Sequence, residues 1–171
     1  VQNVSGTKLA KGHVWQFTAT AAVGPGSFAS VFSNFGTGSD TTSGLDFGDV
    51  DGDGDLDIAL ANEFGQSLVE LNDGAGNFNV GVRYIGGEQD ANLLVELVDV
   101  DNDGDLDAAM AQVQGQSAVY RNDGAGNFAS SSNFGASAAA SYAIAFADLN
   151  GDGYLDVAVG NDAEQNIAYL N

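Results

Sequence analysis

The sequence contains no cysteine, one proline, one histidine and only four lysine and arginine residues. Without cysteine there is neither a disulfide framework nor a cysteine-type zinc site, so the stability that a secreted domain often takes from disulfides needs another source, of which a metal is the usual one. The few basic residues stand against 24 Asp and Glu, which gives a net charge of -20. Nucleic acid and anionic membrane surfaces are therefore poor partners, because both bind a basic face.

Long hydrophobic runs are also absent. No apolar run approaches the roughly 20 residues of a membrane span, so no membrane insertion is expected. Residues 1–12 lack the hydrophobic core of a signal peptide, from which we expect that any signal peptide has already been removed. A chain of 171 residues with 44% hydrophobic content is long enough for a folded core, and we expect it to be soluble.

The side chains for conventional catalysis are scarce. The only histidine, His13, lies in the irregular N-terminal stretch, and without a cysteine or a second histidine no catalytic dyad or zinc site forms. There is no G-x-S-x-G elbow and no P-loop. Of the 24 acidic residues, 13 lie in three short stretches whose repeated pattern indicates a role other than catalysis. We therefore predict that the protein is not an enzyme.

Those three acidic stretches form a repeat. They read D-V-D-G-D-G-D-L-D at 49–57, D-V-D-N-D-G-D-L-D at 99–107 and D-L-N-G-D-G-Y-L-D at 148–156, and their first residues are 50 and 49 positions apart. The flanking sequence NDGAGNF occurs identically at 72–78 and 122–128. A period near 50 indicates stacked supersecondary units, and four-stranded propeller blades fall in this range.

Apolar residues alternate on both sides of each acidic stretch, which is the pattern of a strand with one buried face. In the first repeat the alternation passes through Leu45 and Phe47, then resumes after the stretch at Ile58 and Leu60. Each repeat has a third run that ends on an Asn and a fourth that begins at a Phe: Asn72, Asn122 and Asn171; Phe28, Phe78 and Phe128. With regular turn signals and one proline, these runs predict an all-β chain with four strands per repeat.

Each acidic stretch offers oxygen donors at alternate positions, as a cation-binding loop does. Calcium takes about six to eight oxygen ligands, and a loop with Asp or Asn at positions 1, 3 and 5, a carbonyl at 7 and a further carboxylate supplies them. Position 6 is always glycine, as the sharp turn requires. Position 7 varies to tyrosine, which indicates that its carbonyl is the ligand. We therefore predict three calcium sites: Asp49, Asp51, Asp53, Asp55 and Asp57; Asp99, Asp101, Asp103, Asp105 and Asp107; Asp148, Asn150, Asp152, Tyr154 and Asp156.

Two competing interpretations are less favourable. An EF-hand needs a bidentate Glu at position 12, where this chain has Leu60, Met110 and Val159. Magnesium prefers fewer protein ligands and more water than calcium does. A single acidic run is a weak signal of any metal, but three runs with matched spacing and glycine are a strong one. Asn150 and Tyr154 lower the charge of the third loop, which we expect to be the weakest site.

These residues resemble the FG-GAP/VCBS repeat family, found in the propeller of integrin α subunits, in many secreted microbial proteins and in some lectins. The resemblance covers about residues 26–171, and D-x-[DN]-x-D-G-x-x-D is its most specific part. It implies propeller blades with a calcium loop between the first two strands of each repeat, an extracellular or cell-surface setting, and binding rather than catalysis. Propellers of that family commonly have seven blades, whereas this chain has three repeats.

The expected architecture is all-β, with β-propeller-type blades: three four-stranded repeats at 26–75, 76–125 and 126–171, and an N-terminal extension at 1–25 with one extra strand. Three blades cannot close into a ring, because a propeller needs about four. The sequence FTATAA at 17–22 aligns with SLVELN of the first repeat and is a surplus strand. Three explanations remain open: a fragment of a longer propeller, a closed ring of two chains, or an open polymer formed by N-terminal strand addition.

A glycan or protein ligand is the other class of partner. Sugar recognition uses exposed aromatic side chains, and the candidates are Trp15, Tyr84, Tyr120 and Tyr169, although cross-strand packing is the simpler explanation for them. Asn3 begins an N-glycosylation sequon, which is used only in a host that carries out this modification. The predicted function is a calcium-stabilised extracellular module with a structural, adhesive or self-assembly role, and the alternative is a lectin.

Overall fold

The structure is a computed structural model that describes residues 34–171 except 79, 89 and 137–139, and this part of the chain is built of strands without a helix. The prediction of an all-β protein is confirmed. No helix in the described part is therefore available to cross a membrane. The strands are β1 (Thr42–Gly48), β2 (Asp57–Asn62), β3 (Ser67–Leu71), β4 (Gly81–Ile85), β5 (Ala91–Val98), β6 (Asp107–Gln114), β7 (Ala118–Arg121), β8 (Ser130–Asn133), β9 (Ser141–Ala147), β10 (Asp156–Asn161) and β11 (Ile167–Tyr169).

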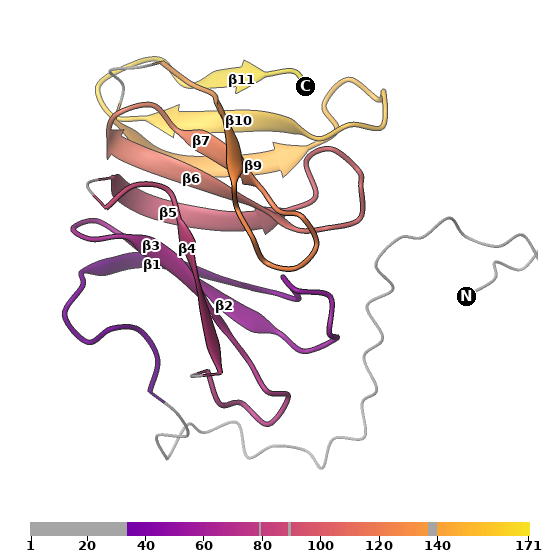
Figure 1. Ribbon diagram of the computed structural model, residues 1–171. Coiled ribbons are helices and arrows are strands. Elements are labelled where there is room, and N and C mark those ends of the chain that lie inside the picture. The colour runs from indigo at the N-terminus through magenta and orange to yellow at the C-terminus, as the bar shows by residue number, and fades with distance from the viewer. Residues whose placement is uncertain (1–33, 79, 89, 137–139) are drawn as a thin grey trace, which may run out of the picture. The chain divides into compact units, whose positions relative to one another are not determined.

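The strands form three antiparallel sheets in which each strand pairs with its neighbour in sequence (Figure 1). Sheet 1 has the order β1-β2-β3-β4 and sheet 2 the order β5-β6-β7-β8. Sheet 3 contains β9-β10-β11, so it has three strands among the described residues where four were expected. The strand that follows Phe78 or Phe128 completes the sheet of the preceding strands, so the sheets are offset by one strand from the 50-residue sequence repeats.

The sheets are layered in the order 1, 2, 3, as the colour change from indigo to yellow shows in Figure 1. Strand β5 lies against β1 and β2, and β9 lies against β5 and β6. One core cluster joins Val69 of sheet 1 to Val95 and Met110 of sheet 2. A second joins Ala109 of sheet 2 to Val157 of sheet 3. Each described sheet therefore packs on the next, and the three of them do not form a closed ring.

Burial differs between equivalent strands because of this layering. All six residues of β2 are buried, so this strand is covered on both faces rather than on one. On β1, Leu45 and Phe47 are 47% and 49% exposed, although the alternation predicted a buried face. Val95 and Ile144, the equivalents of Leu45, are buried, because each packs on the preceding sheet. The equivalents of Phe47, Leu97 and Phe146, are partly buried. No described sheet precedes sheet 1, which explains the exposed side chains of β1.

Carboxylates on the first strand of a sheet bond to the first strand of the next sheet. Asp46 accepts a hydrogen bond from the backbone N–H of Leu97 at 2.8 Å, and Glu96 accepts one from the N–H of Phe146. Burial raises the pKa of Glu96, the negative charge of Asp46 raises it further, and the bond from Phe146 opposes both. The charged form of Glu96 is therefore unfavourable in the folded protein.

Replacement of Glu96 by Gln is expected to stabilise the protein near pH 7 and to have no effect near pH 4. A raised folded-state pKa means that the contribution of Glu96 is full below its unfolded value of 4.5 and is lost as the pH rises through the folded value. Gln keeps an acceptor for Phe146 without the charge, so we expect a rise in melting temperature of about 3 °C at pH 7. The exposed Glu88→Gln is the control for the loss of one negative charge. An equal rise in Glu96→Gln at both pH values would contradict the assignment.

Candidate metal centres

Each acidic loop connects the first and second strands of one sheet, as the resemblance implied. Residues 49–56 join β1 to β2, residues 99–106 join β5 to β6, and residues 148–155 join β9 to β10. All three loops fold by hydrogen bonds from their own backbone to their own carboxylates. The same sequence pattern thus gives the same local structure three times.

The Asp at position 1 organises the turn of each loop. Asp49 accepts hydrogen bonds from the backbone N–H groups of Gly52 at 2.9 Å and Gly54 at 3.1 Å. Asp148 accepts the equivalent bonds from Gly151 and Gly153, and the bond from Gly153 is the main reason that the pKa of Asp148 lies below its usual value. The carboxylate therefore stays ionised at neutral pH.

Position 6 of the loop requires glycine for a backbone reason. Gly54, Gly104 and Gly153 have φ angles of +98°, +100° and +91°, which side chains with a Cβ rarely adopt. Position 4 also has a positive φ, and there Asn102 takes the place of glycine with a φ of +60°. Asparagine tolerates this left-handed conformation better than most residues do, which accounts for the one change of sequence at position 4.

The Asp at position 9 holds the loop against the sheet. Asp57 accepts hydrogen bonds from the N–H of Val50 at 3.0 Å and from the N–H of Asn72 at 2.9 Å. Asp107 accepts the equivalent bonds from Val100 and Asn122. Asp156 accepts them from Leu149 and Asn171. Position 9 therefore ties the loop to the end of the third strand, in addition to any role as a ligand.

Burial and neighbouring charge make two of these carboxylates costly to ionise. Asp57 and Asp107 are 1% and 0% exposed. Burial raises the pKa of both carboxyls, and the nearby Asp51 or Asp101 raises it further, while the backbone hydrogen bonds oppose the shift. A cation placed among these oxygens removes the repulsion that raises the pKa.

The predicted ligands gather most closely in the first two loops. Asp49, Asp51 and Asp57 each offer an oxygen in a group whose members lie within 4.8 Å of one another, and so do Asp99, Asp101 and Asp103. Asp55 and Asp105, at position 7, lie instead against the turns at Gly74 and Gly124. The backbone carbonyl of position 7 therefore stays a predicted ligand. Asp53 adds an exposed carboxylate to the first loop.

One oxygen in the second loop is suited to a cation. Oδ1 of Asp99 is buried and accepts no hydrogen bond from the described residues, whereas Oδ2 accepts one from Gly104 at 3.1 Å. A buried carboxylate oxygen without a partner costs free energy unless a proton or a cation satisfies it. Its neighbours Asp101 and Asp103 supply further oxygens. The donor set, all oxygen and strongly negative, fits a hard divalent cation such as calcium.

The third loop is weaker in charge, as expected. No group of three carboxylates gathers there among the described residues. The side-chain amide of Asn150 donates a hydrogen bond to Oδ2 of Asp152 at 2.8 Å, so one carboxylate oxygen already has a donor. Tyr154 is half exposed, and the sequence prediction assigns its backbone carbonyl to this position.

Arg121 is a residue of the second centre that the motif did not reveal. Its Nη1 lies 3.0 Å from Oδ2 of Asp101 and 3.2 Å from Oδ2 of Asp107. The equivalent residues are Leu71 and Leu170. A signal for Arg121 was available in the sequence. Arg121 is the one basic residue among the three residues that directly precede the repeated Asn.

The substitution Arg121→Leu is expected to raise the calcium affinity of the second loop about fivefold, because the guanidinium competes with the cation for two oxygens and such a partly exposed pair contributes roughly 1 kcal/mol. The stability without calcium should fall at the same time. A calcium titration followed by the amide resonance of Gly104 measures the affinity, with Gly54 of the first loop as the internal reference. An unchanged midpoint at Gly104 would contradict the competition.

The Asn that ends the third run of the second and third repeats connects the sheets through its side-chain amide. Nδ2 of Asn122 donates hydrogen bonds to the carbonyls of Val50 at 2.7 Å and Leu106 at 3.0 Å. Nδ2 of Asn171 donates to the carbonyl of Val100 at 3.0 Å. Each of these amides therefore reaches the acidic loop of the preceding sheet.

The aromatic candidates for sugar binding are placed differently from one another. Tyr120 is half buried and its hydroxyl donates a hydrogen bond to Asp90 at 3.3 Å. Burial raises the pKa of Tyr120 to about 12, and the charge of Asp90 and this bond also raise it. Tyr169 packs at the edge of the core between sheets 2 and 3, and Tyr84 is exposed on β4. Trp15, the sequon at Asn3 and the strand expected at 17–22 lie outside the described residues.

Comparison with known proteins bears on these centres. The family model described as FG-GAP-like repeat matches residues 49–110 and 99–159. Both matches begin at the first Asp of an acidic loop, and together they extend over more than half of the chain. No curated protein matches the chain.

Proposed function

The chain belongs to the FG-GAP-like repeat family, and from this premise we propose that it is a calcium-stabilised extracellular module with a structural, adhesive or self-assembly role. Repeats of this family often bind calcium and are typical of extracellular, generally non-catalytic proteins. The proposal joins this family character to the three acidic loops. It gives the metal a structural role rather than a catalytic one.

The second loop carries the calcium part of the proposal. The buried Oδ1 of Asp99 has no hydrogen-bond donor among the described residues, and it lies beside the carboxylates of Asp101 and Asp103. Protein N–H groups satisfy most of the other loop oxygens only once, which leaves lone pairs for a cation. A divalent cation supplies the positive charge that a chain of net charge -20 lacks.

Calcium bound in a loop would hold two strands and the end of a third together. The loop between β1 and β2 carries its ligands on one short segment, and Asp57 connects that segment to the backbone of Asn72 after β3. Because the folded loop binds the cation and the unfolded chain does not gather these ligands, calcium favours the folded state. The cation would therefore take over the stabilising role that disulfides have in other secreted domains.

The self-assembly part is supported by the exposed ends of the layered sheets. Leu45 and Phe47 are half exposed on sheet 1, and sheet 3 has three strands among the described residues. Apolar faces and open strand edges are association surfaces unless something covers them. The alternative of a lectin has no comparable support, because Tyr120 and Tyr169 are engaged in packing.

Isothermal titration of the calcium-free protein tests the calcium part. We expect saturable binding to three sites, with amide shifts of Gly54, Gly104 and Gly153 that assign each step to a loop, and with the third loop filling last. A variant with Asn at position 5 of every loop should lose the binding: Asp53→Asn, Asp103→Asn and Asp152→Asn.

The matched control removes three negative charges from exposed positions outside the loops: Glu88→Gln, Asp162→Asn and Glu164→Gln. This control should bind calcium as the unmodified chain does. Equal loss of binding in both variants would show that net charge, rather than the loops, attracts the cation. Absence of saturable binding to the unmodified chain would overturn the proposal.

A further inference from the structure

The outer edges of the three sheets differ. In sheets 1 and 2 the third strand is covered by a fourth, because β3 pairs with β4 and β7 pairs with β8. In sheet 3, β11 pairs with β10 on one side, and no described residue pairs with its other side. An open strand edge presents backbone N–H and C=O groups that accept a further strand.

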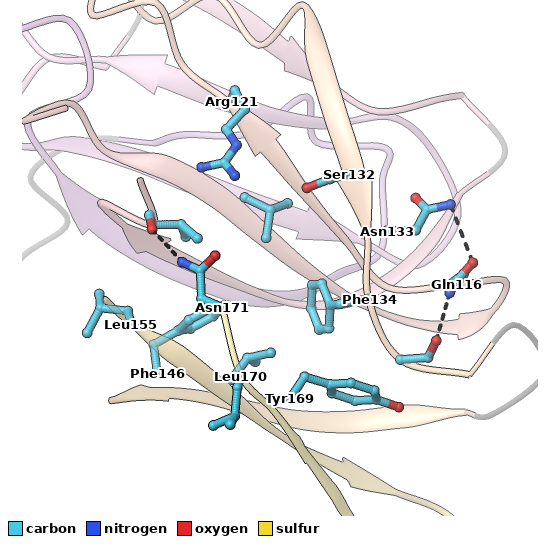
Figure 2. A pocket seen from close by; sticks show the side chains of 14 residues that line it. Gln116, Arg121, Ser132, Asn133, Phe134, Phe146, Leu155, Tyr169, Leu170 and Asn171 are labelled. Atoms are coloured by element: carbon cyan, nitrogen blue, oxygen red, sulfur yellow. Dashed lines mark hydrogen bonds between the residues drawn. The ribbon is translucent and has the colours of Figure 1, made fainter. Parts of the chain in front are cut away.

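A cavity adjoins this open edge. It has a volume of about 380 Å³, and its lining includes Val100, Phe134, Phe146, Leu155 and Tyr169 (Figure 2). Figure 2 shows Phe134, Phe146, Leu155 and Asn171 around the same space. The cavity therefore lies where sheet 2 meets sheet 3 and has an apolar wall.

The equivalent position between sheets 1 and 2 is filled by the turn GAGNF of residues 124–128. The backbone of Gly126 passes so close to Val50 and Arg83 that a Cβ there would lie 3.7 Å and 3.3 Å from their side chains. Phe128 packs against the core cluster between sheets 1 and 2. The turn that fills this junction directly follows Asn122, and the cavity adjoins Asn171 at the same repeat position.

Asn122 and Asn171 differ in the hydrogen bonds that their side-chain oxygens accept. Oδ1 of Asn122 accepts a hydrogen bond from the N–H of Gly126 at 2.9 Å, and Oδ1 of Asn72 accepts one from Gly76 at 3.0 Å. Oδ1 of Asn171 accepts none from the described residues, although its N–H and amide nitrogen are both engaged. A glycine N–H of the following turn therefore occupies this acceptor in the first two repeats.

The outward face of sheet 3 is also uncovered. Val50 and Val100, at position 2 of the first two loops, are 1% and 6% exposed because the next sheet covers them. Leu149, at position 2 of the third loop, is 55% exposed. Ala158 is exposed as well, whereas its equivalent Ala109 is fully buried. The outward face of sheet 3 therefore exposes apolar side chains whose equivalents on sheets 1 and 2 are covered by the next sheet.

The sequence contains a segment that matches the turn and strand which cover the other sheets. Residues 24–35 read GPGSFASVFSNF, in register with GAGNFNVGVRYI at 74–85, which contains β4. In the repeats that have both, this segment covers one sheet and then leads into the first strand of the next. Residues 36–41 lead into β1, which belongs to sheet 1. Sheets 1 and 3 lie on opposite sides of sheet 2 (Figure 1), so β1 is not adjacent to sheet 3 of the same copy.

We propose that residues 24–35 of one copy add to β11 of a second copy and fill the adjoining cavity with the turn at 24–28, Phe28 taking the position of Phe128. Sheet 1 of the first copy then covers sheet 3 of the second, which buries Leu45 and Phe47 against Ala158 and Leu149. The contact rests on the self-assembly part of the proposed function and is independent of its calcium part. It is head-to-tail, and a closed ring and an open polymer both contain it.

The other two sheets limit the register of the added strand to two neighbouring positions. Val69 pairs with Arg83 and Val119 pairs with Ser132. Ala168 is the equivalent of Val69 and Val119, while residues 33 and 32 are the equivalents of Arg83 and Ser132. Ser33 of one copy therefore lies opposite Ala168 of the other in the register of sheet 1, and opposite Ile167 in the register of sheet 2.

Disulfide trapping tests this register, since the chain has no cysteine of its own. The full chain with Ser33→Cys and either Ala168→Cys or Ile167→Cys is oxidised in calcium and separated without reductant. We expect covalent dimers and higher species from one of these two variants, in which mass spectrometry identifies the bond to residue 33. The matched control, Ser33→Cys with Glu164→Cys, places the second cysteine at an exposed position before β11 and should give about tenfold less of its cross-link.

A second variant tests the anchor without cysteine. The substitution Phe28→Asp should reduce the mass in solution, measured by light scattering, to that of one chain, while the melting temperature at high dilution stays unchanged. Cross-linking at 167 and at 168 that is no greater than at 164, or an oligomer that is unaffected by Phe28→Asp, would overturn this contact and leave self-assembly through another surface. A single-chain mass for the unmodified protein would overturn self-assembly itself. Cross-linking of residue 33 to 167 or 168 without calcium binding would support the contact and reject only the calcium role.

Discussion

In excess EGTA the protein is expected to melt about 15 to 30 °C below its melting temperature in millimolar calcium. Free calcium at about 100-fold the Kd of a site stabilises the folded state by about 2.7 kcal/mol, so three sites contribute about 8 kcal/mol. In a chain of this size about 1 kcal/mol shifts the melting temperature by about 2 to 4 °C. The acidic loops are the physical origin of the effect, because without a cation each gathers carboxylates that repel one another.

Differential scanning calorimetry measures this shift, and two controls define its cause. Magnesium at the same concentration as calcium should restore much less stability, because it prefers fewer protein ligands. Sodium chloride at high concentration distinguishes general screening of the net charge from binding at a site. Salt weakens the repulsion between exposed carboxylates, but it does not fill a calcium site. Equal melting curves in EGTA and in calcium would refute a structural role for the metal.

The substitution Asp57→Ala is expected to destabilise the protein with or without calcium, whereas Asp51→Ala should act in calcium alone. Asp57 is buried and accepts the N–H groups of Val50 and Asn72, and leaving one buried and one partly buried donor unsatisfied costs about 3 kcal/mol. This loss should lower the melting temperature by about 6 to 12 °C in EGTA. Asp51 accepts one longer bond, 3.3 Å, from Asp53, so its removal in EGTA costs nothing and relieves repulsion.

The pair of variants separates the two roles that the loop carboxylates combine. Substitution of a carboxylate that holds the backbone should lower the melting temperature without calcium. Substitution of a carboxylate that only binds the metal should reduce the difference between the melting temperatures with and without calcium. Asp57→Asn refines the test, because the amide keeps one oxygen acceptor but loses the charge. Indistinguishable behaviour of Asp51→Ala and Asp57→Ala in EGTA would show that position 9 has no structural role beyond the metal.

Much of the fold was predictable because the same pattern of strands and acidic loop occurs three times in the sequence. The all-β class, the runs that became β2 and β3, and the position of each acidic loop between two strands follow from alternation and spacing. The burial of β1 was not predictable in the same way. Leu45 and Val95 have the same pattern, and only the presence of a preceding sheet makes one exposed and the other buried. Local sequence specifies a strand, whereas its surroundings decide which face is covered.

The metal centres show the same division. Motif spacing alone predicted where each acidic loop lies, and the use of the carbonyl at position 7 stays a prediction. Arg121 and Asn122 escaped prediction because their roles depend on contacts far along the chain: Asn122 donates to the carbonyl of Val50, 72 residues away. Sequence marked the position as a repeated Asn but gave no information about what lies opposite it in the next layer.

That contact between layers has a consequence for how the molecule unfolds. Asn122 and Asn171 each bond to the backbone of the preceding acidic loop, so the order of one repeat supports the ion site of its neighbour. Such a chain behaves as a one-dimensional array with nearest-neighbour coupling, in which disorder starts at the ends and spreads inward. Loss of the cation from the middle loop would then weaken two junctions at once, and loss from the terminal third loop only one. The order of the repeats along the chain thus sets a hierarchy of cooperativity that three independent sites of equal chemistry would not have.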